Sequence, residues 1–240
     1  MFSRYSLRFG PMVRRFPKVD NQGLTLLECL VAISVIGISV AMISPVVLLA
    51  VGNRVQSQRT EQALQLAQSE IDKLRLIIER GDRTNIAAIN ALLPAAPAGV
   101  NSVGDFEASV PPPEEIELTA ANRYQTDLNF ARSVDIDSDG TTDFAVQLFR
   151  NSTTTTTSGV ALDFGVRVYT PAALDKPASD LGTRVARVQG RGLSSGSSAT
   201  NPLAVIYTTV IKSDTDTSLC DYYEYIESTT GQTASSPGAC

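Results

Sequence analysis

Gly23-Leu24-Thr25-Leu26-Leu27-Glu28 opens an uncharged apolar run that continues from Cys29 to Val51. A run of this length meets the requirement of about 20 apolar residues for a helix that crosses a bilayer. Glu28 stands at the start of the run, where a buried carboxylate costs about 2.5–3.5 kcal/mol unless it finds a partner. The sequence therefore predicts one transmembrane segment, at about residues 29–51, whose acid needs a counter-charge.

Cleavage of the chain four residues before Glu28 would create that counter-charge. A peptidase that cuts between Gly23 and Leu24 leaves an α-amino group on Leu24. In a second copy of the chain, staggered by about one helical turn, this cation can lie against the Glu28 carboxylate. The motif thus favours a chain that is cleaved and then assembles with further copies.

A plain signal anchor and a secretory signal peptide are the alternative interpretations of this segment. A secretory signal places its cleavage site after an apolar core of about 7–15 residues. Here the apolar core is longer, and the best cleavage site precedes it. The pattern therefore favours a retained helix with a removable leader.

The leader, residues 1–23, is basic and carries a net charge of +4. Positive flanks of a membrane span stay on the cytoplasmic side, which predicts a cytoplasmic leader. Since the whole chain carries −5, residues 24–240 carry −9. An acidic chain of this kind argues against a nucleic-acid partner, because binding phosphates requires clustered Lys and Arg.

Helical periodicity continues beyond the apolar run, from Arg54 to Arg80. Apolar residues recur there at steps of three or four, which is the spacing of one helix face: Ala63, Ala67, Ile71, Leu74 and Ile78. No glycine or proline interrupts this segment, and Gly81 supplies a stop. We expect a single helix from about Thr25 to about Arg80, whose second half packs one face against a globular head.

The head, residues 81–240, is predicted to contain an antiparallel sheet. A short helix is expected at Thr84–Leu93, within an irregular connection that extends to about residue 123. Runs rich in β-branched and aromatic residues then predict strands: Tyr124–Val134, Phe144–Phe149, Val160–Thr170, Arg184–Val188 and Leu203–Ile211. A long helix packed on such a sheet is the simplest way to bury both apolar faces, so the predicted fold class is α+β.

This order of leader, motif, span and helix resembles the type IV pilins and the pseudopilins of related secretion machines. Their pattern is Gly, an apolar residue, then Thr-Leu-(Ile/Leu)-Glu, and Leu24 departs from it only in being neither Phe nor Met. The resemblance implies cleavage after Gly23 and N-methylation of Leu24 by a prepilin peptidase/N-methyltransferase. It also implies that Glu28 guides subunit docking, and that Pro45 stands where many members carry a helix-kinking proline.

A narrower resemblance covers Gly23–Ala32 and Arg54–Arg75, which are similar to the pseudopilins of hormogonium polysaccharide secretion in cyanobacteria. It implies a subunit of a pseudopilus or type IV pilus-like machine that supports polysaccharide or protein secretion and associated motility. The implied partners are other pilin or pseudopilin subunits and an inner-membrane assembly platform with its ATPase. The precursor would be a single-pass inner-membrane protein with a periplasmic head, which then enters a pseudopilus or a pilus at the cell surface.

Two other functions remain open at this point. One is a minor type IV pilin whose head mediates adhesion. The other is a membrane-anchored calcium- or carbohydrate-binding module that never polymerises. Catalysis has no candidate, because the chain contains no histidine for a Ser-His or Cys-His system. No cofactor is therefore expected to be required.

An acidic loop in the head is a candidate calcium site. Side-chain oxygens at alternate positions and a glycine resemble the start of a calcium loop: Asp135, Asp137, Asp139 and Asp143, with Gly140. The twelfth position is Val146, so the bidentate glutamate of an EF-hand is missing. The alternative is a solvated hairpin turn at Asp139-Gly140.

The three cysteines have different settings. Cys29 lies in the apolar run and is expected to be a small apolar residue. Cys220 and Cys240 lie in the part that the resemblance places in an oxidising compartment, and many type IV pilins carry a disulfide-bounded loop near the C-terminus. A Cys220–Cys240 disulfide is the expectation, and two free thiols are the alternative.

Overall fold

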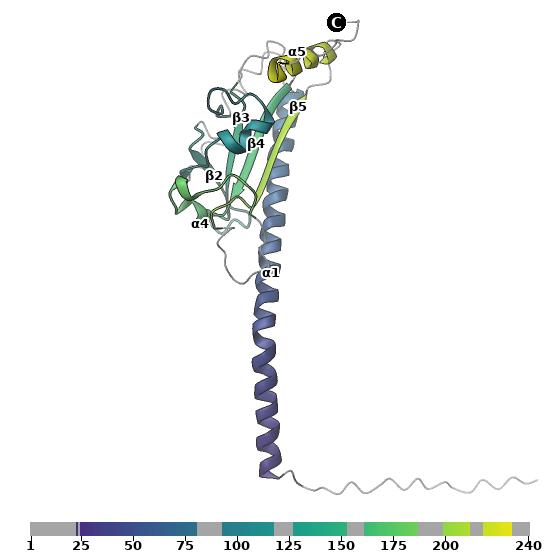
Figure 1. The fold of residues 1–240 in the computed structure, drawn as a ribbon, viewed down its shortest axis with the longest axis vertical. Coiled ribbons are helices and arrows are strands. Elements are labelled where there is room, and N and C mark those ends of the chain that lie inside the picture. The colour runs from purple at the N-terminus through teal and green to yellow at the C-terminus, as the bar shows by residue number, and fades with distance from the viewer. Residues whose placement is uncertain are drawn as a thin grey trace, which may run out of the picture. The chain divides into compact units, whose positions relative to one another are not determined.

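The computed structural model describes residues 23, 25–80, 93–117, 127–152, 161–186, 199–211 and 218–231. The chain divides into two compact units, Met1–Leu48 and Leu49–Cys240. Helix α1 (Leu26–Arg80) begins in the first unit and ends in the second. The strands all belong to the second unit, the head, and Figure 1 shows them in chain order by colour.

Helix α1 begins at a side-chain cap. The Thr25 hydroxyl accepts a hydrogen bond from the Glu28 backbone N–H, at 3.3 Å. Thr-x-x-Glu is a capping-box sequence, in which the Ser or Thr hydroxyl satisfies a backbone donor of the first turn. The helix then continues through Pro45 to Arg80. The predicted helix from about Thr25 to about Arg80 is confirmed.

The head contains one sheet of five strands in the order β1-β2-β3-β4-β5. The strands are β1 (Glu115–Glu117), β2 (Phe130–Val134), β3 (Phe144–Arg150), β4 (Ala161–Tyr169) and β5 (Ala204–Ile211). Strands β2 to β5 pair in antiparallel fashion, with Val146 opposite Val168 and Val166 opposite Ile206. Strand β1 is parallel to β2, so the sheet is mixed. The α+β fold class is therefore confirmed, with one parallel pair added.

Three predicted elements differ from the structure or lie outside the described residues. Strand β2 begins at Phe130 rather than Tyr124, because residues 128–129 form a turn. The strand predicted at Arg184–Val188 is absent over residues 184–186. There the backbone makes a single hydrogen bond, from the Ala186 N–H to the Pro202 carbonyl, and does not pair with a neighbouring strand. The helix predicted at Thr84–Leu93 lies outside the described residues, except for Leu93.

One face of the sheet packs against the second half of α1. The helix contributes the predicted apolar residues, all of them buried: Ala63, Ala67, Ile71, Leu74 and Ile78. The strands contribute alternate residues, as the two-residue period of a strand requires: Phe144, Val146, Leu148, Leu162, Phe164, Val166 and Val168. Glu70 of the same helix is also buried and forms an ion pair with Arg132 of β2 at 2.7 Å.

The opposite face of the sheet is covered by residues 94–113, which include η2 (Val103–Asp105) and α3 (Phe106–Ser109). Phe106 packs edge-on against Phe149 of β3, with ring centroids 5.1 Å apart. Gly165 of β4 makes room for this packing, because a Cβ there would overlap the Phe149 ring. We call residues 94–113 the cover segment.

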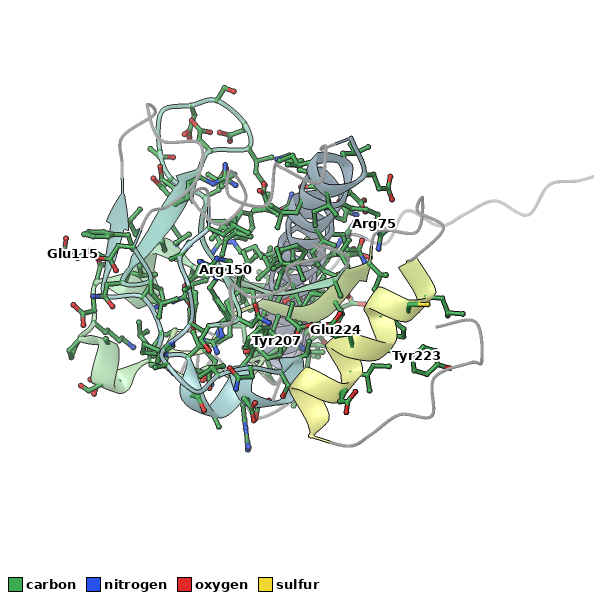
Figure 2. All side chains as sticks on the ribbon, turned by 90° about the horizontal axis from the view of Figure 1, so that it is seen from above. Arg75, Glu115, Arg150, Tyr207, Tyr223 and Glu224 are labelled. Carbon is green, nitrogen blue, oxygen red and sulfur yellow. The ribbon has the colours of Figure 1, made fainter. Side chains whose placement is uncertain are left out.

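Arg167 of β4 fastens the cover segment to the sheet. Its guanidinium is fully buried and donates to the Phe106 carbonyl at 2.7 Å and to the Val110 carbonyl at 2.9 Å. It also donates to the Tyr207 hydroxyl at 2.8 Å. Figure 2 places Tyr207 and Arg150 in the middle of the head. Among the described residues no acid pairs with Arg167, so carbonyl and hydroxyl oxygens satisfy its charge.

The same face also carries α4 (Pro171–Leu174) and η3 (Ala178–Asp180), whose cluster includes Tyr169 and Ala173. Helix α5 (Ser218–Thr230) was not predicted from the sequence. It is attached through Tyr225, whose hydroxyl hydrogen-bonds to the buried Asp163 carboxylate of β4. The Thr209 hydroxyl donates to the same carboxylate at 2.5 Å. In Figure 2, α5 with Tyr223 and Glu224 lies on the side of the head opposite Glu115.

Candidate functional site

The first candidate site is the amino-terminal end of α1. Gly23 is exposed, and no atom lies within 4 Å of the position that a Cβ would take. Leu24, the predicted first mature residue, lies outside the described residues. Glu28 is exposed in the first helical turn, where the N-terminal end of the helix favours negative charge. Gly23 before the predicted cleavage position and Glu28 after it are therefore both exposed to solvent.

The apolar part of α1 is exposed over its whole circumference. Every residue from Leu26 to Val55 is exposed, and none of the most apolar window is buried. Among the described residues, α1 is the one helix that is long and apolar enough to cross a membrane. Apolar side chains in this number need cover, either from lipid or from other helices.

The serine hydroxyls inside this apolar part are satisfied within the helix. The hydroxyls of Ser34, Ser39 and Ser44 donate to the carbonyls four residues earlier, at 2.8–2.9 Å. Such bonds remove the cost of placing a hydroxyl in hydrocarbon. Pro45, the predicted assembly position, lies within α1 directly after Ser44. The helix can therefore enter a lipid or a protein core without a buried, unpaired hydroxyl.

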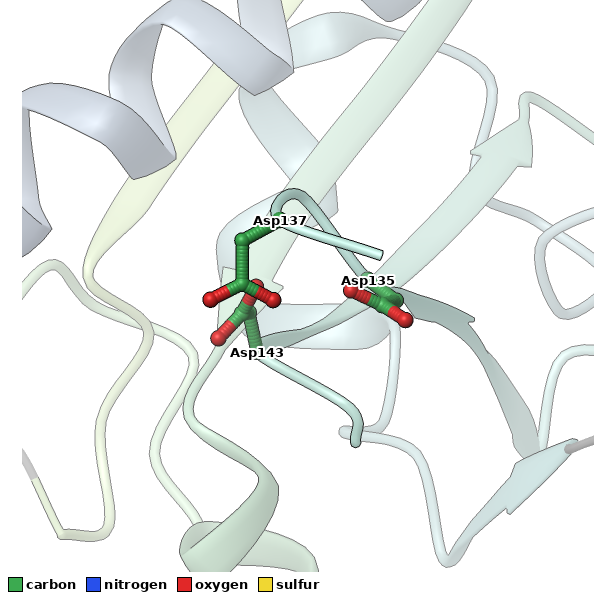
Figure 3. Close-up of side chains that lie close together, drawn as sticks. All are labelled: Asp135, Asp137 and Asp143. Atoms are coloured by element: carbon green, nitrogen blue, oxygen red, sulfur yellow. The ribbon is translucent and has the colours of Figure 1, made fainter. Parts of the chain in front are cut away.

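The second candidate site is the loop between β2 and β3. It brings together three of the four predicted ligands, Asp135, Asp137 and Asp143, whose carboxylate oxygens lie within 4.8 Å of one another (Figure 3). Asp139 is not part of this cluster. Its carboxylate accepts hydrogen bonds from both the hydroxyl and the backbone N–H of Thr141, at 2.5 and 2.7 Å.

The loop closes through hydrogen bonds from its own backbone to these carboxylates. Asp135 accepts from Ser138 and Gly140, and the Ile136 N–H donates to Asp143 at 2.9 Å. Two residues, Ser138 and Gly140, have positive φ values of 61° and 87°. Gly140 adopts such a conformation at low cost, which explains the glycine at this point of the loop.

The electrostatics of the loop reflect its clustered acids. The Asp139 N–H lowers the pKa of Asp137, but partial desolvation and the carboxylates of Asp139, Asp143 and Asp135 together raise that pKa above its ordinary value. Hydrogen bonds from Thr141 lower the pKa of Asp139. An all-oxygen cluster of this kind suits calcium chemically. Calcium binding at this loop stays a prediction.

The cysteines occupy two different parts of the structure. Cys29 is a free, exposed thiol in the apolar part of α1. Cys220 lies in the first turn of α5. Cys240 lies outside the described residues, so the predicted Cys220–Cys240 disulfide stays a prediction.

The buried charged groups of the head act in its packing. Arg167 and Glu70 are both enclosed by hydrogen-bond or ion-pair partners from other elements. Burial raises the pKa of Asp163, while the hydrogen bonds from Thr209 and Tyr225 oppose the rise. In the part of the chain that the structure describes, these groups connect layers of the fold and do not converge on a shared cleft.

Comparison with known proteins identifies the amino-terminal site. Residues 19–44 match the family described as prokaryotic N-terminal methylation motif. No curated protein and no solved structure matches the chain. The match supports a type IV pilin-like prepilin subunit, which points to a structural role rather than catalysis. It implies processing by prepilin peptidase and assembly with other pilin subunits, and it agrees with membrane anchoring through α1.

Sequence reasoning missed one residue of this site. Thr25 caps α1, so the Thr-Leu-Leu-Glu segment has a local structural purpose in addition to the processing signal. The capping-box spacing was the signal that could have identified it. Cleavage after Gly23 would therefore leave a mature chain that starts one residue before its helix cap.

Proposed function

We propose that this chain is a prepilin-like structural subunit that is cleaved after Gly23, N-methylated on Leu24 and assembled through α1 into a pseudopilus or type IV pilus-like filament. In this proposal the filament supports the secretion of polysaccharide or protein and the associated motility. The head faces the periplasm in the precursor. The inner-membrane platform and its ATPase drive assembly.

One observation carries the proposal: Glu28 stands in a methylation motif at the start of a helix whose apolar surface is uncovered. An acid in that setting requires a cation when the helix enters lipid or a helix bundle. The Leu24 amine of a neighbouring copy is such a cation, and it exists only after cleavage. Processing and assembly are therefore chemically linked.

The first test is the N-terminal mass of the protein recovered from membranes, in cells with and without the prepilin peptidase. We expect a peptide that starts at Leu24 and carries one added methyl group, and we expect residues 1–23 to be retained when the peptidase is absent. A chain that keeps its leader in both strains would exclude the proposal.

The role of Glu28 is tested by Glu28→Gln, which keeps the size of the side chain and removes its charge. We expect normal cleavage and loss of assembly by at least about tenfold, since an unpaired amine in an apolar environment costs several kcal/mol. Glu79→Gln, at an exposed acid of the same helix, is the matched control and should be cleaved and assembled normally. A Glu28→Gln chain that assembles normally would contradict the proposed mechanism.

The secretion role is tested in a deletion strain complemented with the wild-type chain. We expect the deletion to lose surface polysaccharide or an exported protein, and complementation to restore it. Loss of surface attachment with intact export would favour a minor pilin that acts in adhesion.

A further inference from the structure

Three charges on α1 lie between its apolar part and the packed head without a partner. Arg54, Arg59 and Glu61 are exposed, and within the described residues none of them forms an ion pair or a side-chain hydrogen bond. The ion pairs of the head involve other residues, such as Lys73 with Glu70 and Arg184 with Glu107.

Their spacing prevents pairing along the same helix. Favourable pairs on a helix are three or four residues apart. Arg59 and Glu61 are two residues apart, which is not a pairing distance on a helix, while Arg54 and Glu61 are about two turns apart. A shallow hollow of the surface lies beside these charges and is lined by Val55, Gln58, Arg59, Glu61, Gln62 and Gln65.

We infer that this surface is a charge-matching contact between two copies of the chain, in which Glu61 of one copy lies between Arg54 and Arg59 of its neighbour. The inference rests on the proposed assembly and specifies its register. It makes use of the stagger of about one turn that brings the Leu24 amine of one copy level with Glu28 of the other.

The same stagger aligns the second set of charges. With a shift of about four residues, Arg54 of one copy is about 4.5 Å below Glu61 of the other, and Arg59 is about 3 Å above it. Both offsets are within the reach of an arginine side chain. Glu61 follows Glu28 by 33 positions, which on an ideal helix is roughly nine turns and 60°. The two acids therefore point to similar sides of α1, Glu28 at the start of the apolar run and Glu61 ten residues beyond its end at Val51.

The occupant of this surface is a second copy because the contact continues the apolar interface of the proposed assembly and because its charges are complementary. Exposed ion pairs contribute little to affinity and act more on register. A reversed charge, by contrast, places like charges opposite each other at every subunit contact. The strongest effect should therefore come from charge reversal.

The contact is tested by cross-linking in cells that contain the peptidase and the assembly machine. Two tagged full-length copies, both Cys29→Ala, carry Arg59→Cys and Glu61→Cys respectively, and a short bifunctional thiol reagent joins them. We expect a 59–61 cross-link in assembled protein. The control pair, Arg59→Cys with Glu79→Cys, is about 24 Å apart at this stagger and should react at background level.

Charge reversal supplies the second readout. Glu61→Arg should lower the assembled fraction about fivefold, and adding Arg54→Glu and Arg59→Glu should restore it to within about twofold of wild type. Glu79→Arg, an exposed acid on the same helix, is the matched control and should assemble normally.

The outcomes separate this inference from the proposed function. If wild type assembles but the 59–61 pair reacts no more than the 59–79 pair, the inference is wrong and the assembly proposal stands. If wild type itself does not assemble, the proposal of assembly fails. A third outcome concerns lipid. Charge reversal of Arg54 and Arg59 could weaken the binding of the unassembled precursor to vesicles that contain anionic lipid, while Glu61→Arg leaves assembly unchanged. In that case the two arginines face lipid phosphates and the inference is overturned.

Discussion

At the scale of single residues, two buried charged groups determine how the layers of the head join. Arg167 is enclosed by carbonyl and hydroxyl oxygens, and Asp163 is enclosed by two hydroxyls. Neither has a charged partner among the described residues. Groups of this kind are sensitive to substitution, because removing one partner leaves the other buried and unsatisfied.

The Arg167→Lys variant should be destabilised by about 2–4 kcal/mol, because an ammonium cannot donate to the Phe106 and Val110 carbonyls and to Tyr207 at the same time. Thermal unfolding of the detergent-solubilised chain measures the loss. Arg184→Lys is the control, since Arg184 is 79% exposed and its pair with Glu107 should contribute little. Equal melting temperatures for both variants would contradict the role given to Arg167.

The Asp163→Asn variant should change the pH dependence of stability. Burial raises the folded-state pKa of Asp163 above its unfolded value of about 3.9. The stability that the carboxyl contributes is therefore fully present below about pH 3.9 and is lost as the pH rises through the folded-state pKa. We expect wild type to lose stability relative to Asp163→Asn as the pH rises above about 4. A difference in stability that does not change with pH would refute this assignment.

At the scale of elements, the sequence predicted those parts whose residue periodicity is long and regular. Helix α1 and strands β3, β4 and β5 follow from patterns of seven or more residues that are rich in apolar side chains. Strand β1 is three residues long and contains two glutamates, so no local pattern marks it. Its pairing with β2 arises from tertiary contacts, which a local pattern does not contain.

The candidate site shows the same limit. Alternation of acids predicted four ligands, and the structure gathers three of them. Asp139 turns toward Thr141 because its side chain closes a local turn, a competing interaction that spacing alone does not reveal. Helix α5 carries aromatic and acidic residues at helical spacing, but its attachment depends on Tyr225 meeting Asp163, 62 positions earlier in the chain.

The acidic loop should respond to calcium if it binds the ion. A calcium concentration about tenfold above the dissociation constant would stabilise the head by about 1.4 kcal/mol, seen as a higher melting temperature than in chelator. Asp137→Asn should abolish this difference, whereas Asp139→Asn should retain most of it, since Asp139 lies outside the cluster. Identical melting in calcium and chelator for wild type would exclude a calcium site.

The predicted Cys220–Cys240 disulfide should stabilise the chain by restraining the segment that follows Cys220 of α5. Closing a loop of about 20 residues stabilises by about 3 kcal/mol in the chain-entropy model. We expect Cys220→Ser and Cys240→Ser to be destabilised equally, and the double variant to be no worse than either. Mass shifts after alkylation, with and without reductant, measure the bond directly. Alkylation of both cysteines in the unreduced, unfolded chain would show that they are free thiols.

At the scale of the whole molecule, α1 serves two environments along one continuous helix. Its first part satisfies its serine hydroxyls and, apart from Glu28 in the first turn, exposes a mainly apolar surface, while its second part buries one face against the sheet. The charges at Arg54, Arg59 and Glu61 lie at the transition between these parts. A chain built in this way keeps its uncovered apolar surface apart from the helix face that packs the head.

Arg167 also sets an order of events during synthesis. The carbonyls that it binds belong to Phe106 and Val110, 61 and 57 positions earlier in the chain. A ribosome therefore releases the cover segment well before the strand that fastens it. Contacts of such long sequence separation form late, after the loop-closure entropy has been overcome. The rings that pack on Phe106 belong to Phe149 of β3 and Tyr207 of β5, so this packing is complete only after β5 has emerged. Until then the nascent head is open to chaperones and proteases.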